Sequence, residues 1–185
     1  MQFSQNHTFT GRDAQLIELA RVIFQDSGTP VISQSIIGIG GIGKTQLAVE
    51  FCFRYGRFFH GVHWIDARPI EASEKDSSIP LLTKINAELA QCGSEMMLPA
   101  WPAEQPEQVC RTLATWAKDG TRIVVLDNLE SEKDAQDILQ RLSSAGDLRV
   151  LITARKQDWP KSIVSHICRL GQFLPDESLS FFSKK

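Results

Sequence analysis

Helical and strand-like patterns of apolar residues alternate along this chain. Apolar positions recur at helical spacing near residues 13–23, 44–55, 82–92, 106–118 and 135–142. Short apolar runs typical of strands lie between them, at 31–37, 61–66, 123–126, 150–153 and 167–170. This alternation predicts a doubly wound α/β fold with a mainly parallel sheet, whose ligand binds at the C-terminal ends of the strands.

Local signals predict where several of these elements begin and end. The segment from Thr10 to Asp13 resembles a helix-capping box, and Gly93 is expected to end the helix that starts near residue 82. Pro106 is suited to the first position of a helix. The first strand holds the run Ser33-Gln34-Ser35, which is more polar than a buried strand usually is.

Composition narrows the class of protein. The chain has 185 residues, enough for one domain with a core, and is 42% apolar and 23% charged. A net charge of −2 gives no reason to expect nucleic-acid or membrane attraction. No apolar run approaches the roughly 20 residues of a membrane span, and the N-terminus does not resemble a secretory signal. We therefore expect a cytoplasmic protein.

The cysteines and histidines show no ligand or disulfide spacing. Cys52 and Cys110 fall on apolar helix faces and Cys168 falls in a strand, which predicts buried thiols in a reducing compartment. His60 and His63 flank Val62 and are expected to be one solvated and one packed side chain.

The strongest chemical signal is the segment Gly38 to Thr45, which matches the phosphate-loop pattern G-x-x-x-x-G-K-[ST] without a mismatch. Its glycines allow backbone N–H groups to turn towards a polyphosphate. Lys44 can reach the β- and γ-phosphates, the Thr45 hydroxyl can ligate Mg²⁺, and the N-terminus of the following helix favours an anion. The predicted phosphate-binding positions include Gly38, Gly40, Gly41, Ile42, Gly43, Lys44, Thr45 and Gln46.

Two later strands end in residues that suit the same site. Asp127 directly follows the buried run 123–126, where a carboxylate can hold Mg²⁺ together with Thr45. Arg155 ends the next strand, where a guanidinium can reach a terminal phosphate, and Thr153 can share that role. Lys44, Asp127 and Arg155 are the candidate catalytic residues.

Five segments in this order resemble the STAND-class signalling NTPases of the NB-ARC type. They are Phe9 to Asp13, the loop Gly38 to Thr45, Val62 to Asp66, Val124 to Asn128, and Leu151 to Arg155. The resemblance covers about residues 9 to 182. It implies a three-layer P-loop NTPase with a five-stranded sheet of order 2-3-4-1-5, numbering the strands along the chain.

The resemblance also implies a function and a domain plan. Phe9, Gly11 and Arg12 would line the adenine and ribose side, and Arg155 would sense the γ-phosphate. Residues 1–173 would form the nucleotide-binding domain, while 174–185 would begin a helical domain of a larger protein with winged-helix and effector or repeat domains. Such proteins are switches that bind ATP or ADP with Mg²⁺, and the ATP state can form homo-oligomers.

The residues after Asp127 bear on turnover and on the alternatives. Many relatives carry a second acid where this chain has Asn128, and Glu130, in an extended segment, would point to a different side. These features predict slow ATP hydrolysis at most. An AAA+-type remodelling ATPase with steady turnover and a P-loop small-molecule kinase remain alternatives. A GTPase fits least, because no guanine-recognition motif is present.

Overall fold

The computed structural model describes residues 3–25, 31–68 and 80–172. Its elements follow the order α1, β1, α2, β2, α3, α4, β3, α5, β4 and β5, with short 3-10 turns at Gly56–Phe58 and Ser143–Ala145. The helices span Asp13–Ile23 (α1), Lys44–Tyr55 (α2), Leu81–Glu95 (α3), Gln105–Asp119 (α4) and Glu132–Leu142 (α5). The strands span Val31–Ile37 (β1), Val62–Asp66 (β2), Arg122–Asp127 (β3), Leu148–Ala154 (β4) and His166–Arg169 (β5).

The five strands form one sheet in the order β2-β3-β4-β1-β5, and every neighbouring pair is parallel. This confirms the predicted α/β fold and strand order. The register pairs Ile37 of β1 with Ala154 of β4, and Leu126 of β3 with Ile152 of β4. The phosphate-loop strand and the Asp127 strand therefore flank β4, and all three end at the same edge of the sheet.

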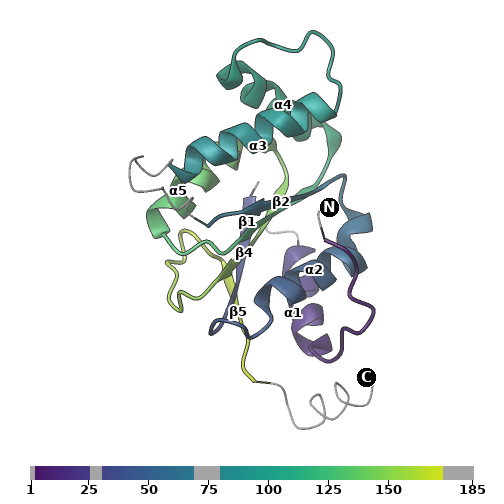
Figure 1. Ribbon diagram of the computed structural model, residues 1–185, viewed down its shortest axis with the longest axis vertical. Helices are drawn as coiled ribbons and strands as arrows, with labels where there is room; N and C mark the ends of the chain where they lie inside the picture. The colour runs from purple at the N-terminus through teal and green to yellow at the C-terminus, as the bar shows by residue number, and fades with distance from the viewer. Residues whose placement is uncertain (1–2, 26–30, 69–79, 173–185) are drawn as a thin grey trace.

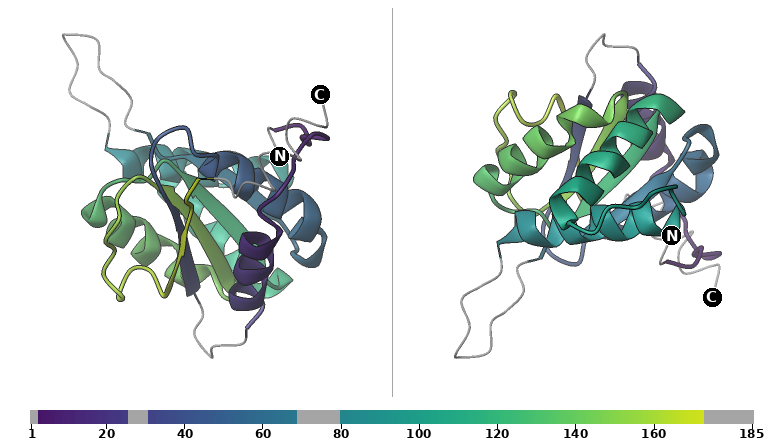
Figure 2. Two further views of the ribbon diagram at one scale, coloured as in Figure 1. Left: turned by 90° about the horizontal axis from the view of Figure 1, so that it is seen from below. Right: turned by 90° about the horizontal axis from the view of Figure 1, so that it is seen from above.

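Helices cover both faces of the sheet (Figures 1 and 2). On one face, α3, α4 and α5 bury a core that includes Leu89, Trp116 and Ile138. On the other face, α1 and α2 bury a second core that includes Leu19 and Phe51. Strands β3 and β4 are buried along their whole length, as expected of central strands between two helical layers.

The polar run in β1 is nevertheless buried. Ser33 donates a hydrogen bond from its hydroxyl to the carbonyl of Ile163, and Ser165 donates one to the carbonyl of Ser33 at 2.7 Å. These distant partners satisfy Ser33 inside the protein. Gln34 and Ser35 are fully buried as well.

Three local expectations were wrong. The capping box at Thr10 is not formed, because α1 begins at Asp13 and its N-cap is Arg12, in the left-handed region with φ of 63°. Gly93 lies inside α3, where a Cβ would come within 2.1 Å of the Thr112 hydroxyl and 2.3 Å of the Trp101 ring, so this glycine allows a close approach of two segments. Cys110 is exposed on α4, whereas Cys52 and Cys168 are buried as expected.

The remaining expectations concern Pro106, the two histidines, membrane spans and the domain boundary. Pro106 occupies the first turn of α4, one position later than expected, and His63 is packed while His60 is exposed. In the described part of the chain, no helix is both long and apolar enough to cross a membrane. The expected domain boundary at 173/174 lies outside the described residues.

Candidate nucleotide-binding site

The phosphate loop connects β1 to α2 and is shaped by its glycines. Gly41 and Gly43 have φ of 76° and 100°, values that other residues reach only with strain. Gly38 is needed for space, because a Cβ there would lie 2.8 Å from the carbonyl oxygen of Leu170, just after β5. The loop is thus held between the end of β1 and the segment that follows β5.

Lys44 lies at the first position of α2 and is folded against the loop. Its ammonium donates hydrogen bonds to the carbonyls of Gly38 and Ile39, both at 2.9 Å. Burial lowers the pKa of Lys44, the carboxylates of Glu130 and Asp127 oppose that shift, and Arg155 adds to it. Opposite and like charges around the ammonium show that these side chains share one electrostatic environment.

Asp127 lies at the end of β3 and connects three elements. Its Oδ1 accepts a hydrogen bond from the Thr45 hydroxyl at 2.9 Å and another from the Thr153 hydroxyl. Asp127 is 4% exposed, so its carboxylate is oriented by these neighbours. Thr153, near the end of β4, also accepts a hydrogen bond from the backbone N–H of Asn128 at 3.0 Å. One carboxylate thus connects the start of α2 to the ends of β3 and β4.

Asn128 changes the direction of the chain after β3. Its φ is 64°, in the left-handed region that asparagine tolerates better than most residues. Its amide donates to Asp127 Oδ2 at 3.2 Å and to Asp66 Oδ1 at 3.4 Å. Because the segment is not extended here, the alternation of side chains assumed from the sequence is broken.

Glu130 consequently points into the same site and holds Arg155. Its Oε1 accepts from the backbone N–H of Arg155 at 2.8 Å and from Arg155 Nε at 3.2 Å. Its Oε2 accepts from the backbone N–H of Lys156 at 3.0 Å. The expectation that Glu130 lies on a different side was therefore wrong, and the cause is the left-handed turn at Asn128.

These residues surround one pocket of about 520 Å³ at the C-terminal ends of the strands. Its lining combines the loop, the start of α2 and the ends of β2, β3 and β4: Gly40, Gly41, Gly43, Lys44, Thr45, Gln46, Arg68, Asn128, Glu130 and Arg155. Arg68 was not expected from the sequence. Its guanidinium pairs with Asp66 at 2.6 Å, and the only cue in the chain was its position just after a strand.

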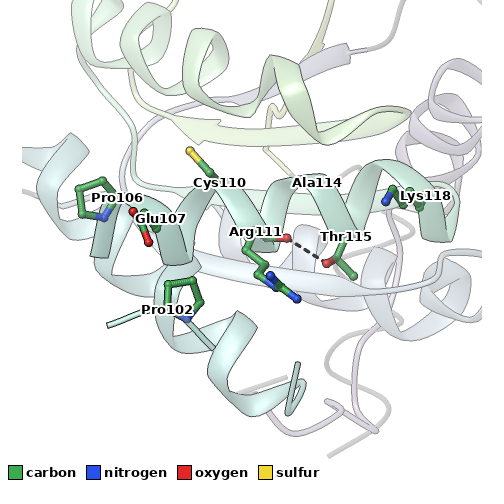
Figure 3. A pocket seen from close by; sticks show the side chains of 8 residues that line it. All are labelled: Pro102, Pro106, Glu107, Cys110, Arg111, Ala114, Thr115 and Lys118. Atoms are coloured by element: carbon green, nitrogen blue, oxygen red, sulfur yellow. Dashed lines mark hydrogen bonds between the residues drawn. The ribbon is translucent and has the colours of Figure 1, made fainter. Parts of the chain in front are cut away.

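A larger pocket, of about 710 Å³, lies along the outer face of α4 (Figure 3). Pro102, Cys110, Arg111 and Lys118 are among its lining residues, and the Thr115 hydroxyl donates to the carbonyl of Arg111 at 2.9 Å. None of the phosphate-loop residues lines it. Size alone therefore does not identify the site, whereas the convergence of glycines, charges and strand ends does.

The segment from Phe9 to Arg12 lies apart from this pocket lining. Phe9 packs against the core under α1 and α2, and the Arg54 guanidinium lies 5.8 Å from its ring centroid. Gly11 and Arg12 both have positive φ, and Arg12 donates from Nη2 to the carbonyl of Gly171 at 2.7 Å. Gly171 follows Leu170, which packs on Gly38, so this segment reaches the loop through the chain after β5.

The other candidate residues lie within the loop and at its exit. Ile42 is half-buried against the core beneath α2. Gln46 is exposed, and its Oε1 accepts a hydrogen bond from Asn6 at 3.4 Å. These contacts connect the loop to the N-terminal segment as well as to the sheet.

The donor set suits a nucleotide phosphate chain with a divalent cation. Glycines of the loop leave room for oxygens beside backbone N–H groups, and Lys44 and Arg155 supply positive charge. Thr45 and Asp127 lie within hydrogen-bond distance, so one hard cation could contact both oxygens. The geometry therefore defines a P-loop NTPase domain.

Comparison with known families gives a narrower assignment. The NB-ARC domain model matches residues 13–185, so the chain belongs to the NB-ARC family. It is accordingly a nucleotide-binding domain, and the family implies Mg²⁺ binding in general.

Similar proteins agree with this assignment. The regulatory protein AfsR of Streptomyces griseus is 28% identical over 178 residues, and AfsR of Streptomyces coelicolor is 27% identical over 187 residues. Each alignment covers 95% of this chain and 17% of the relative, so the chain spans about a sixth of the length of these regulators.

Among solved structures, C. elegans PCH-2 matches with a TM-score of 0.50 and 12% identity, over 96% of this chain and 47% of that one. Domain III of the Thermotoga maritima replication initiation protein DnaA matches with a TM-score of 0.50 and 11% identity, over 98% of this chain and 75% of that one. At these identities the likeness concerns the fold alone.

Proposed function

We propose that this chain is the ATP/ADP-binding switch domain of a larger signalling protein, in which the bound nucleotide controls domain closure and oligomerisation. The observation that carries the proposal is that two separate sets of contacts, one at Asp127 and one at Arg155, lie around the same pocket. Asp127 accepts hydrogen bonds from Thr45 of α2 and Thr153 of β4, while the Arg155 guanidinium contacts Glu130, a contact that a phosphate could replace. Such an arrangement makes the number of phosphates matter.

Each candidate site residue has a proposed role in that switch. Lys44 binds the phosphates, Thr45 and Asp127 hold Mg²⁺, and Arg155 senses the γ-phosphate. Phe9, Gly11 and Arg12 line the adenine and ribose side, which the hydrogen bond from Arg12 to the chain after β5 supports. Mg²⁺, when bound, neutralises phosphate charge.

The proposed domain plan follows the family. Residues 1–173 form the nucleotide-binding domain and 174–185 begin a helical domain. The low coverage of the AfsR relatives supports a larger parent protein in which further domains close over the nucleotide. We expect slow hydrolysis at most, because Asn128 is a neutral amide and both oxygens of Glu130 accept hydrogen bonds from residues 155 and 156.

The test is the identity and affinity of the bound nucleotide. Nucleotide released from the purified chain by denaturation should be ADP or ATP, and GDP would contradict the adenine assignment. In titrations with ATP and ADP, Arg155→Ala should weaken ATP by about ten- to a hundredfold, since a charge-assisted bond is worth about 1.5–3 kcal/mol, and should weaken ADP much less. Equal losses for both nucleotides would refute a γ-phosphate sensor. Lys161→Ala, a change of the same charge in the loop after β4, is the matched control.

A steadily turning remodelling ATPase is the second candidate, and the position of Glu130 is what favours it. Glu130 is a carboxylate in the pocket, and a general base contributes typically 10²–10⁴-fold to a rate. Glu130→Gln should leave a slow switch's turnover nearly unchanged. A loss of a hundredfold or more would favour the remodelling ATPase.

A further inference from the structure

Strand β2 is at the edge of the sheet, and its pairing shows which of its backbone groups face outward. Gly61 accepts from the N–H of Ile123 at 3.0 Å, and Ala67 donates to the carbonyl of Asp127 at 2.7 Å. In a parallel ladder alternate residues face the same neighbour, so residues 61, 63, 65 and 67 pair with β3. The N–H and C=O groups of Val62, Trp64 and Asp66 therefore point away from the sheet.

Helix α3 lies beside this edge and runs antiparallel to β2 (Figure 1). Lys84 donates to the carbonyl of Asp66 at one end, and Cys92 contacts His63 Nδ1 at 3.5 Å further along. The contact from Lys84 confirms that the carbonyl of Asp66 faces outward and closes that end of the edge. Within the described residues, Val62 and Trp64 have no backbone partner on that side.

A groove of about 320 Å³ runs between β2 and α3 and ends near α4. Beneath the groove, His63 stacks on Trp116 with ring centroids 4.1 Å apart and lies 3.2 Å from Arg122 Nη1, while Ile65 and Leu89 are buried below the surface. The groove therefore offers the outward backbone groups of β2 along one wall and the His63 ring beneath.

The outer wall of the groove, on α3, is acidic. Glu88 and Glu95 are exposed and line it, seven residues apart and so about 10 Å apart along the helix. Gln91 donates to Glu95 at 2.9 Å, and the only basic side chain that reaches β2 from α3, among the described residues, is Lys84 at the closed end.

We propose that this groove binds an extended peptide segment that joins the sheet beside β2, with its central side chain over the His63 ring and basic side chains two positions to either side. In a strand, residues i−2, i and i+2 point to one face, and i−2 and i+2 are about 13 Å apart, a span that flexible lysine side chains adjust to Glu88 and Glu95. Strand addition of this kind takes affinity from backbone hydrogen bonds and specificity from alternate side chains. A second copy of this chain is disfavoured, because pairing through β2 would bring the acidic walls of two α3 helices together.

The probe is the peptide acetyl-Thr-Lys-Thr-Val-Thr-Lys-Thr-amide, titrated into the ¹⁵N-labelled chain. Shifts should concentrate on the amides of Val62 and Trp64, and these amides should gain protection from hydrogen exchange. The same peptide with glutamate in place of both lysines should not bind. Two further peptides carry N-methyl groups on alternate amides. One set should abolish binding and the other should be tolerated, because only one edge of an added strand faces β2.

The matched protein variants reverse charge at exposed positions. Glu88→Lys/Glu95→Lys should weaken the lysine peptide about tenfold, as expected for two exposed ion pairs replaced by repulsion. Glu107→Lys/Asp158→Lys, with the same change in charge away from the groove, should have little effect.

Several results would overturn the proposal. They are the absence of binding at millimolar peptide, equal tolerance or equal loss with both N-methyl sets, and equal loss in the two charge-reversal pairs. Self-association of the chain with shifts at Trp64 in the absence of peptide would assign the edge to a second copy instead. None of these measurements depends on the nucleotide, so their outcome is independent of the proposed switch function.

Discussion

Replacing Glu130 by glutamine is expected to raise the preference of the site for ATP over ADP. Glu130 accepts hydrogen bonds from Arg155 Nε and from two backbone N–H groups, so the guanidinium is held by an internal carboxylate. If Arg155 binds the γ-phosphate, that phosphate must compete with Glu130. Glutamine keeps a carbonyl oxygen for a backbone N–H but loses the charge that attracts the guanidinium.

The magnitude follows from the exposure of the pair. The side chains of Arg155 and Glu130 are 71% and 34% exposed, so water screens their attraction. Exposed ion pairs are worth about 0.2–1 kcal/mol, which corresponds to a rise of about 1.4- to 5-fold in the ratio of ATP to ADP affinity. Removal of a negative charge from the pocket also favours both nucleotides, which is why the ratio and not the affinity is the quantity to measure.

The assay is isothermal titration calorimetry with ATP and with ADP at saturating Mg²⁺. Wild type, Glu130→Gln, Arg155→Ala and the double variant together form a double-mutant cycle. The ratio should rise in Glu130→Gln and stay constant when Glu130→Gln is added to Arg155→Ala. The same rise in both backgrounds would show that Glu130 acts on the nucleotide without Arg155 and would refute the reasoning.

Three further predictions follow from single contacts. Thr153→Val should lower the free energy of unfolding by about 2–4 kcal/mol in urea denaturation and weaken Mg²⁺-dependent nucleotide binding, because Asp127 loses a donor and the Asn128 N–H loses its acceptor. Thr115→Val, at a half-buried position of α4 where the hydroxyl contacts only its own helix, should cost far less. Burial and then Arg122 lower the pKa of His63 to about 4, below its value near 6.5 in the unfolded chain. The unfolded state therefore takes up the proton first, and the free energy of unfolding should fall by about 3 kcal/mol at most as the pH drops from 6.5 to 4. His63→Phe should show a smaller fall over that range, and an identical fall would contradict the assignment. In a Cys92→Ser background, which removes the half-buried thiol, a thiol reagent should modify exposed Cys110 at once and Cys52 and Cys168 only on unfolding, since burial raises the pKa of both to about 12. A fast reaction that survives when Cys110→Ser is added would contradict this.

The sequence predicts the fold and the centre of the site because both depend on local patterns. Glycine spacing, the following lysine and threonine, and the apolar run before Asp127 are readable in order along the chain. Parallel strands end at one edge, so the sequence alone leads us to expect Thr45, Asp127 and Arg155 near one another.

What the sequence did not predict depends on contacts between distant residues. Gly93 resembles a helix end in the sequence, but Trp101 and Thr112 crowd it and α3 continues. Glu130 was placed on the wrong side because the left-handed turn at Asn128 has no clear sequence signature. Arg68 is recognisable as a pocket residue only once Asp66 has fixed its guanidinium.

The position of Lys44 affects the thermodynamics of ligand capture. An ammonium has three N–H donors, and two of them are already directed to the carbonyls of Gly38 and Ile39. A lysine side chain carries about 2 kcal/mol of rotamer entropy, and folding rather than ligand capture has removed most of it here. The third donor can therefore be offered to an anion with little further ordering. An arginine at this position would keep the charge, but its planar guanidinium could not donate to the two carbonyls in the same way. The loop would then lose hydrogen bonds that hold it in shape before any ligand binds.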